Sequence, residues 1–234
     1  MALDLLDRMK REGVGRTAIA YNAAISACEK GLVPHKALEL FEQMKSEGVT
    51  PTVITFSALI SAAEKGQQWK LALAVLEEMK ASGHGANVIA YSAAISALSK
   101  GQMWEKALEL FREIERSGNT PSIVTYNATM TALEKGLQWE RALDLFDEMK
   151  AKHLPITVVS YGSSISACEK GLQYRQCLEY LDEMTELGYV SCSLSALCDV
   201  PTDTHIKILP LCLSQDQEKC HHFWRCYVLH GEVL

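Results

Sequence analysis

The sequence predicts an all-helical solenoid built from two-helix repeats of 35 residues. The segment ISACEKG at residues 25–31 returns at residues 165–171, four periods later. An aromatic residue recurs with the same period, at Tyr21, Phe56, Tyr91, Tyr126 and Tyr161. A Lys-Gly pair follows it in every unit, beginning at Lys30, Lys65, Lys100, Lys135 and Lys170. A fixed period of this length indicates stacked repeats, each of which buries its apolar face against its neighbours.

The first helix of each unit is predicted from its apolar spacing. In residues 18–52, Tyr21, Ile25 and Cys28 are spaced i, i+4, i+7, which places them on one helical face. The pair Lys30-Gly31 then closes the helix. Because glycine adopts positive φ without steric cost, we expect Gly31 to form a left-handed cap.

A second helix follows in the same unit. Ala37, Phe41 and Met44 again show the i, i+4, i+7 spacing. Gly48 ends this helix, and Pro51 prevents its continuation. A small residue enters the second helix of every unit, which allows two helices to approach closely: Ala37, Ala72, Ala107, Ala142 and Cys177. Large aromatic residues recur near its start and are expected to pack between adjacent units: Trp69, Trp104, Trp139 and Tyr174.

The period divides the chain into five units with a flanking segment at each end. Residues 1–17 match a second helix alone, so the chain opens in mid-repeat, as a piece of a longer array or after loss of a first helix. The units are 18–52, 53–87, 88–122, 123–157 and 158–192. Residues 193–234 share no period with the rest and are expected to be irregular or poorly ordered.

Composition and motifs favour no enzyme class. The apolar fraction of 48% is typical of a folded protein, and no apolar run is long enough for a transmembrane helix. Cys28 and Cys168 lie in helical patterns and are interpreted as small buried hydrophobes in a reducing compartment. In the tail, Cys220 and Cys226 are separated by five residues, outside zinc-finger spacing, so no metal site is expected. No catalytic constellation, cofactor motif or small-molecule site is recognised.

The repeat itself resembles a known family. Two units read AYNAAISACEKGLVPHKALELFEQMKSEGVTP and TYNATMTALEKGLQWERALDLFDEMK. The 35-residue length, Y-N at the start of the first helix, K-G at its end and A-L-x-L-F-x-x-M in the second helix are similar to the pentatricopeptide repeat. The resemblance covers residues 1–190 or so. It implies a right-handed superhelix that binds single-stranded RNA, in mitochondria or chloroplasts, with organellar RNA-processing proteins as further partners and no role at a membrane.

Two polar columns are candidates for base selection. Helical repeats read RNA with two or three side chains per base. One column follows the aromatic residue, and the other is the last residue of each unit. By resemblance they form the base-selecting pairs: Asn22 with Thr52, Ser57 with Asn87, Ser92 with Ser122, and Asn127 with Thr157. Helix capping is the alternative role for such residues. By the same resemblance, Ser57 with Asn87 favours adenine, and the asparagine-led pairs favour pyrimidines.

A branched apolar residue lies three positions before the first column. Such residues at a helix start are ordinarily core, but in the resembled family they sandwich each base between successive units. The predicted sandwich residues are Ile19, Ile54, Ile89, Val124 and Val159.

The lysine of the Lys-Gly pair is the predicted phosphate contact. A cation at a helix C-terminus is favourable by about 0.3–1 kcal/mol whatever it binds. Five in register, Lys30, Lys65, Lys100, Lys135 and Lys170, also make a line of positive charge for phosphates. Acidic residues concentrate in the second helices, so the net charge of −6 is compatible with a basic inner surface.

The sequence therefore predicts a non-enzymatic protein that binds single-stranded RNA at about one base per repeat. The expected role is in organellar RNA processing, stability or translation. The alternative is a helical scaffold that binds a protein in the same groove. Steep salt dependence of binding would favour RNA.

Overall fold

The computed structural model describes residues 6, 8–9, 11–12, 16–83 and 85–189. Most of the segment 1–17 lies outside the described residues, as does the whole Cys/His-containing tail 193–234, so the predictions for the tail are not addressed by the structure. The chain forms two compact units that divide after Pro155.

The all-helical prediction is confirmed: the described residues form paired helices and no strand. The first helices of successive repeats are α2 (Ala18–Lys30), α4 (Val53–Lys65), α6 (Val88–Lys100), α8 (Ile123–Lys135) and α10 (Val158–Lys170). The second helices are α3 (Pro34–Ser46), α5 (Trp69–Ala81), α7 (Trp104–Arg116), α9 (Trp139–Ala151) and α11 (Tyr174–Glu186). Every one of these helices contains 13 residues.

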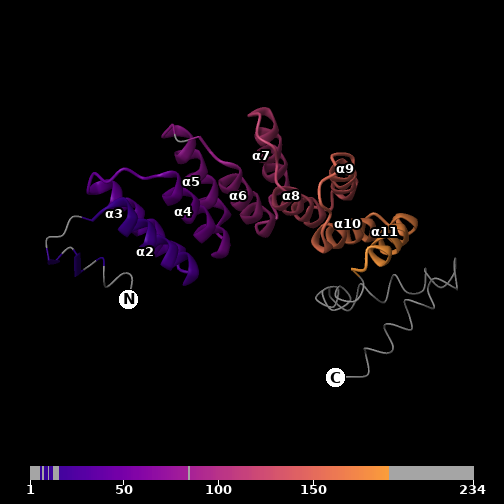
Figure 1. Cartoon of the computed structure of the whole chain (residues 1–234), viewed down its shortest axis with the longest axis horizontal. Coiled ribbons are helices and arrows are strands. Elements are labelled where there is room, and N and C mark those ends of the chain that lie inside the picture. The colour runs from indigo at the N-terminus through magenta and orange to yellow at the C-terminus, as the bar shows by residue number, and fades with distance from the viewer. Residues whose placement is uncertain (1–5, 7, 10, 13–15, 84, 190–234) are drawn as a thin grey trace, which may run out of the picture. The chain divides into compact units, whose positions relative to one another are not determined.

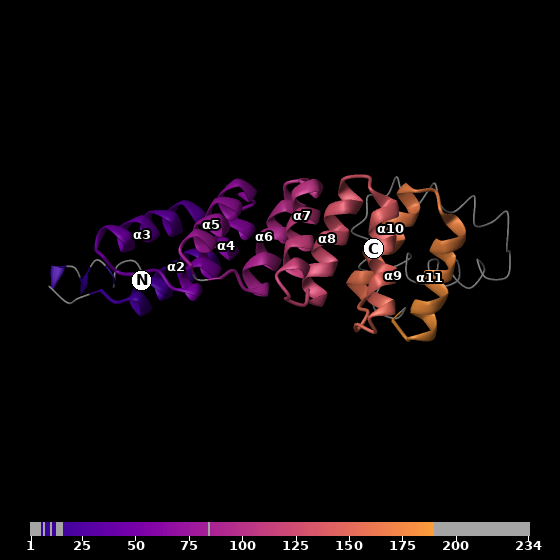
Figure 2. The same cartoon turned by 90° about the horizontal axis from the view of Figure 1, so that it is seen from above.

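In the larger unit the two kinds of helix form two layers (Figures 1 and 2). The first helices α2, α4, α6 and α8 pack each against the next. The second helices α3, α5 and α7 each pack on the first helix of their own repeat and on that of the following one, and α9 packs on α8. The predicted apolar stripes lie at these contacts, with Tyr21, Phe41, Met44 and Phe56 fully buried. Cys28 is buried as expected, and burial raises the pKa of its thiol despite the nearby Lys36.

The glycine of the Lys-Gly pair has a different role from the one predicted. Gly31 has φ −82°, and the left-handed residue is the next one, Leu32, with φ 56°. At Gly101 and Gly136 the reason for glycine is close approach by a tryptophan of the preceding repeat, and at Gly66 it is close approach by Pro34. A Cβ built on Gly101 would lie 2.3 Å from Cδ1 of Trp69 in the preceding repeat. Trp69 and Trp104 therefore pack between repeats as expected. Gly31 is the C-cap of α2, but the prediction that it adopts a left-handed conformation is wrong.

Tyrosines of the first helices are held by glutamates of the second helices. The Tyr91 hydroxyl donates to Glu113 over 2.9 Å, and that of Tyr126 to Glu148 over 2.7 Å. Burial raises the pKa of Tyr126 to about 12, with the Glu148 carboxylate acting in the same direction. Because each tyrosine immediately precedes a predicted base-selecting residue, this bond fixes the helix turn that carries that residue.

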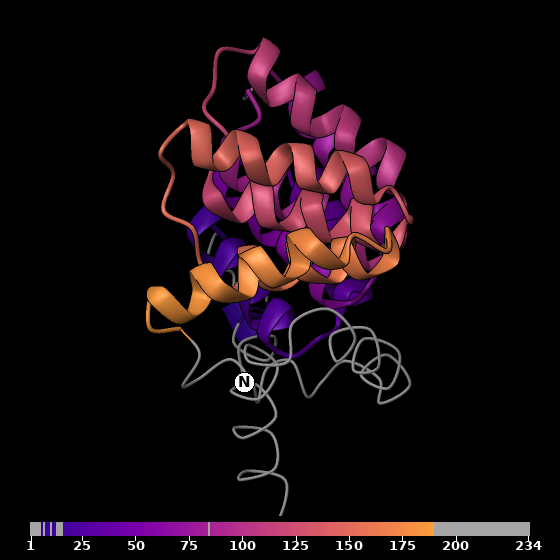
Figure 3. The same ribbon diagram turned by 90° about the vertical axis from the view of Figure 1, so that its right-hand side faces the viewer.

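The smaller unit contains the hairpin of α10 and α11 (Figure 3). It repeats the tyrosine contact, since the Tyr161 hydroxyl donates to Glu183 over 3.0 Å. Cys168 and Cys177 are buried within it.

No described helix is both long enough and apolar enough to cross a membrane. The residues described also contain no cluster of histidine, cysteine and carboxylate side chains suited to a metal ion.

Candidate nucleic-acid interface

The two predicted base-selecting columns meet at the N-terminal ends of the first helices. The last residue of each repeat is the N-cap of the following first helix, as Thr52 is for α4, Asn87 for α6 and Ser122 for α8. The first-column residue belongs to the preceding first helix, which packs alongside. Each site is therefore built from two neighbouring repeats.

The first site, Asn22 with Thr52, is closed by a third side chain. The Asn22 amide nitrogen donates to the Thr52 hydroxyl over 3.3 Å. The hydroxyl of Thr55, which is fully buried, donates to Asn22 Oδ1 over 2.6 Å. Thr55 Oγ1 also accepts from the Thr52 backbone N–H at 3.0 Å, completing a capping box. This arrangement fixes which way the Asn22 amide points and leaves one N–H and one oxygen lone pair for a ligand.

The second site, Ser57 with Asn87, lacks this closure. Asn87 Oδ1 accepts from the Ala90 backbone N–H at 2.8 Å. The residue equivalent to Thr55 is Ala90, which has no hydroxyl. Among the described residues, the Ser57 hydroxyl and the Asn87 amide nitrogen have no hydrogen-bond partner. Both groups are half-buried and free to bond a ligand.

The third site, Ser92 with Ser122, is the most occupied. Ser92 is buried, and its hydroxyl donates to the Val88 carbonyl in its own helix over 2.7 Å. It lies 2.7 Å from the Thr125 hydroxyl, which in turn lies 2.9 Å from that of Ser122. Ser92 therefore has no hydrogen left to donate to a base. Its assignment to base selection stays a prediction that this geometry weakens.

The two members of the fourth predicted pair lie in different units of the chain. Asn127 is half-buried on α8. Thr157 is the N-cap of α10, and its hydroxyl accepts from the Ser160 backbone N–H at 3.3 Å. Pro155 lies one position earlier than the equivalent Pro51 and Pro121 of other repeats, and the Thr157 cap is still formed.

Sequence reasoning missed the buried residue two positions before the first column. We call it the bridge residue, because in two of three sites its hydroxyl contacts both predicted base-selecting residues. The bridge residues are Thr55, Ala90, Thr125 and Ser160. The available signal was the hydroxyl three positions after the N-caps Thr52, Ser122 and Thr157, a spacing typical of reciprocal capping. Capping does not exclude base selection, because Thr52 caps α4 and also contacts Asn22 of the neighbouring repeat, while Asn87 caps α6 with its oxygen and keeps its amide nitrogen free among the described residues.

The predicted sandwich residues are exposed, contrary to the ordinary expectation for branched apolar residues. Ile54 is 66% exposed and Ile89 is 67% exposed. Ile19, Val124 and Val159 are exposed in the same way. Since their side chains contribute little to the core, they are available to contact a ligand.

Glutamates neutralise part of the positive charge that was predicted for the lysines of the Lys-Gly pairs. Lys65 lies 2.7 Å from Glu29 of the preceding repeat, and Lys100 lies 2.6 Å from Glu64. In the next repeat, the position equivalent to Glu29 and Glu64 is Ser99. Lys135, which would pair with a glutamate there, has no ion pair within the described part of the chain. Lys30 likewise has none there, and Lys170 lies in the smaller unit. The line of positive charge is thus interrupted, and phosphate contact by these lysines stays a prediction.

Comparison with known proteins gives the family. The sequence matches the family model of the pentacotripeptide-repeat region of PRORP over residues 8–200. The chain belongs to the pentatricopeptide-repeat family. A search of curated protein sequences finds no match.

Solved structures of this family share the fold. The pentatricopeptide-repeat protein PPR10 from maize is 25% identical, with a TM-score of 0.59 over 88% of this chain and 33% of that one. PPR10 in complex with an 18-nt psaJ RNA element is 21% identical, with a TM-score of 0.65 over 94% of this chain and 35% of that one. The PPR domain of Arabidopsis thaliana PRORP1 in complex with tRNA is 20% identical, with a TM-score of 0.60 over 68% of this chain and 84% of that domain. The chain spans about a third of the length of the PPR10 structures.

Proposed function

We propose that this pentatricopeptide-repeat chain binds single-stranded RNA in a sequence-selective manner, with about one base at each site between neighbouring repeats. The observation that carries the proposal is the recurring placement of polar groups beside an exposed branched side chain. At the Ser57–Asn87 site, a free hydroxyl and a free amide nitrogen lie at the start of first helices that also expose Ile54 and Ile89. Base edges require such short hydrogen-bonding groups, and base faces require apolar contact.

The fold matches support the same proposal, because two of the similar structures are complexes with RNA. We place the chain among non-enzymatic proteins that act on organellar transcripts by covering them, in processing, stability or translation. Mitochondria or chloroplasts are the proposed compartments. With few sites, affinity is expected to be modest and to fall with salt.

The pairing of Lys65 and Lys100 with glutamates is the observation that favours the alternative, a scaffold for another protein. It weakens the cationic surface that RNA requires without removing it, since Lys135 and Lys30 remain unpaired among the described residues.

The test is selection of bound oligonucleotides from a random RNA pool, followed by binding of the selected RNA to variants. Ile54→Ala and Ile89→Ala together should weaken binding about fivefold or more, because each variant loses apolar surface that a bound base would bury, at about 25 cal/mol per Å². Leu137→Ala is the matched control, since Leu137 is equally exposed at 67% but lies outside the predicted columns. No enriched motif, or equal loss in the control, would favour the scaffold.

A further inference from the structure

The third site, Ser92 with Ser122, differs from the two sites before it in the hydrogens that its side chains have left to donate. The hydroxyl groups of Ser122, Thr125 and Ser92 form a continuous chain. Ser122 Oγ lies 2.9 Å from Thr125 Oγ1, which lies 2.7 Å from Ser92 Oγ. Ser92 in turn donates to the Val88 carbonyl oxygen over 2.7 Å. Because a carbonyl oxygen can only accept, it sets the direction of the whole chain.

The directions follow from the single hydrogen that each hydroxyl carries. Ser92 donates to Val88, so it accepts from Thr125. Thr125 has then used its hydrogen and accepts from Ser122. Thr125 Oγ1 also accepts from the Ser122 backbone N–H at 3.2 Å, which fills its second lone pair. All three hydroxyl hydrogens are therefore engaged within the protein, in a chain whose bonds polarise and strengthen one another.

Burial protects this chain from a ligand. Thr125 is fully buried and Ser92 is 7% exposed, while Ser122 is half-buried. A base that took a hydrogen from Ser92 would leave a buried acceptor unpaired, and that cost exceeds the usual net gain from one new hydrogen bond. Ser122 Oγ accepts from the Thr125 backbone N–H at 3.2 Å and keeps one lone pair. That lone pair is what the side chains of this site offer to a base.

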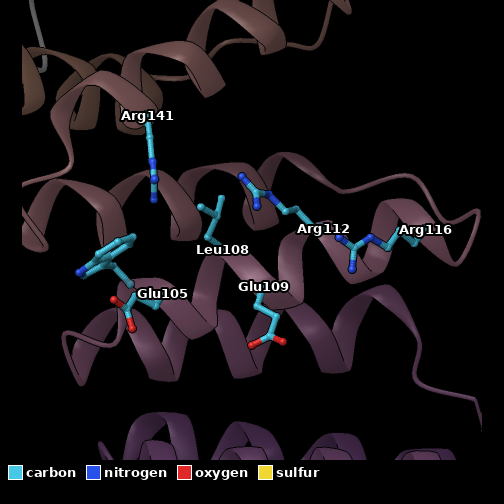
Figure 4. Close-up of a pocket in the computed structure, with 7 residues that line it drawn as sticks. Glu105, Leu108, Glu109, Arg112, Arg116 and Arg141 are labelled. Atoms are coloured by element: carbon cyan, nitrogen blue, oxygen red, sulfur yellow. The ribbon is translucent and has the colours of Figure 1, made fainter.

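Charged side chains of the neighbouring helices do not supply the missing donor. Lys100 is the one charged residue of α6, and Glu134 and Lys135 are those of α8, all at the ends of the helices away from the site. The other charged residues of the same repeat lie on α7 in the second layer, where several of them line a groove of about 430 Å³ (Figure 4). The third site is therefore uncharged and offers an acceptor without a side-chain donor.

An acceptor alone cannot distinguish the four RNA bases. Each base carries an N–H donor on its Watson–Crick edge, an amino group in adenine, cytosine and guanine and a ring N–H in uracil. Bases are distinguished when a site offers donors and acceptors in a fixed order. Asn22 at the first site does so, because it keeps one free N–H and one free lone pair. Backbone N–H groups at the helix starts recur at every site and do not set one site apart.

Stacking at the third site is unaffected by these bonds. Ile89 and Val124, the predicted sandwich residues on its two helices, are 67% and 64% exposed. We propose that the third site holds a base by stacking without selecting it, because Thr125 engages the hydroxyl hydrogens that would otherwise read the base edge. The inference rests on the RNA binding proposed above. Thr125 is thus a specificity-determining residue that acts through Ser92 and Ser122, and the RNA motif contains an unselected base.

The first site is the matched comparison, because its bridge residue is also a threonine and its N-cap also carries a hydroxyl. The two sites differ in the first-column residue, Asn22 against Ser92. An asparagine has a second N–H that the bridge hydroxyl does not engage, whereas a serine has none. Ser92→Asn should therefore give the third site a base preference like that of the first site. Asn22→Ser should remove the preference of the first site.

The probe is a fluorescein-labelled RNA selected from the random pool, together with copies in which each base in turn is replaced by each of the other three. Anisotropy titration with the full chain gives a Kd for each RNA. For the parent chain we expect differences of at least about fivefold at the base that Asn22→Ser affects, and of less than about twofold at the base two places away. Ser92→Asn should raise the second difference to about fivefold. Ser46→Asn, the same substitution on the exposed surface of α3, should change neither.

Thermal melting followed by circular dichroism shows whether the variants fold as the parent chain does. If Ser92→Asn melts below the parent, Asn22→Ser decides, and a first-site preference that survives this substitution overturns the proposal. A base preference of the parent chain at the third site also overturns it, while the proposed function stands. So does a Ser92→Asn variant that melts like the parent and gains no preference. A chain that binds no RNA from the pool overturns both proposals.

Discussion

The sites at Asn22–Thr52 and Ser57–Asn87 occupy the same backbone frame in adjacent repeats and differ in how their side chains are held. In the first, the Thr55 hydroxyl joins both residues, and the Asn22 amide has one orientation. In the second, Ala90 offers no hydroxyl, and the Ser57 hydroxyl has no partner among the described residues. The neighbouring repeats thus provide a natural comparison of a closed and an open site.

The difference has consequences for binding. A preorganised group loses less conformational freedom when a ligand arrives and presents one donor–acceptor pattern. An amide or hydroxyl that can rotate adapts to several patterns. We therefore expect the closed site to discriminate between bases more sharply, and the open site to tolerate more of them.

The largest effect is expected from opening the closed site with Thr55→Val. The substitution keeps the shape but removes the buried hydroxyl, so Asn22 Oδ1 and the Thr52 backbone N–H lose a partner. The free energy of unfolding should fall by about 1–3 kcal/mol, measured by urea denaturation. In competition binding, discrimination at the corresponding base should decrease. Unchanged discrimination in a variant that is measurably less stable would show that the bridge residue acts in folding alone.

A smaller effect is expected from removing the first-column residues themselves. Asn22→Ala should cost about 1 kcal/mol of stability, because the Thr55 hydroxyl can turn to Thr52, 3.1 Å away. Ser57→Ala should change stability by less than about 0.5 kcal/mol, since no bond within the described structure is lost. Parallel thermal and urea unfolding of the two variants measures the contrast, and equal losses would remove the distinction between the sites.

The smallest expected effect is an increase in stability. Ala90→Thr should close the open site, because Thr55 and Thr125 fit the equivalent buried position on the same helical frame. Stability should rise by up to about 1 kcal/mol. Binding to selected RNA should become more sensitive to the base at that site, measured with oligonucleotides that differ at one position. A loss of stability would indicate that the pocket around Ala90 cannot hold the extra atoms.

The 35-residue period was sufficient to predict most of the fold and part of the candidate site. The starts of α2, α4, α6 and α8 coincide with the predicted repeat boundaries, because apolar spacing and capping both recur with the period. The packing of Trp69 and Trp104 between repeats was also predictable. What a single repeat cannot show is contact with the next one. The role of Gly101 was not predicted because Trp69, which approaches it, lies outside its own unit.

Contacts with a neighbouring repeat also explain why the burial of Ser92 and the ion pair of Lys65 were not predicted. The burial of Ser92 depends on Thr125, 33 residues away. The neutralisation of Lys65 depends on Glu29, 36 residues away. Both depend on a neighbouring repeat, and neither is visible in the pattern of one helix. Departures from the period were visible in the sequence, and two of them mark local differences. Ala90 marks the site without a bridging hydroxyl, and Ser99 marks the position at which Lys135 has no glutamate to pair with.

The packing of Trp69 against Gly101 also affects how the protein unfolds. A side chain added at Gly101 would push against the indole and loosen one junction while leaving the repeats on either side intact. Heat or denaturant should then melt the chain in two steps, starting from the weakened junction. The absence of a side chain at Gly101 thereby helps the second and third repeats to unfold together.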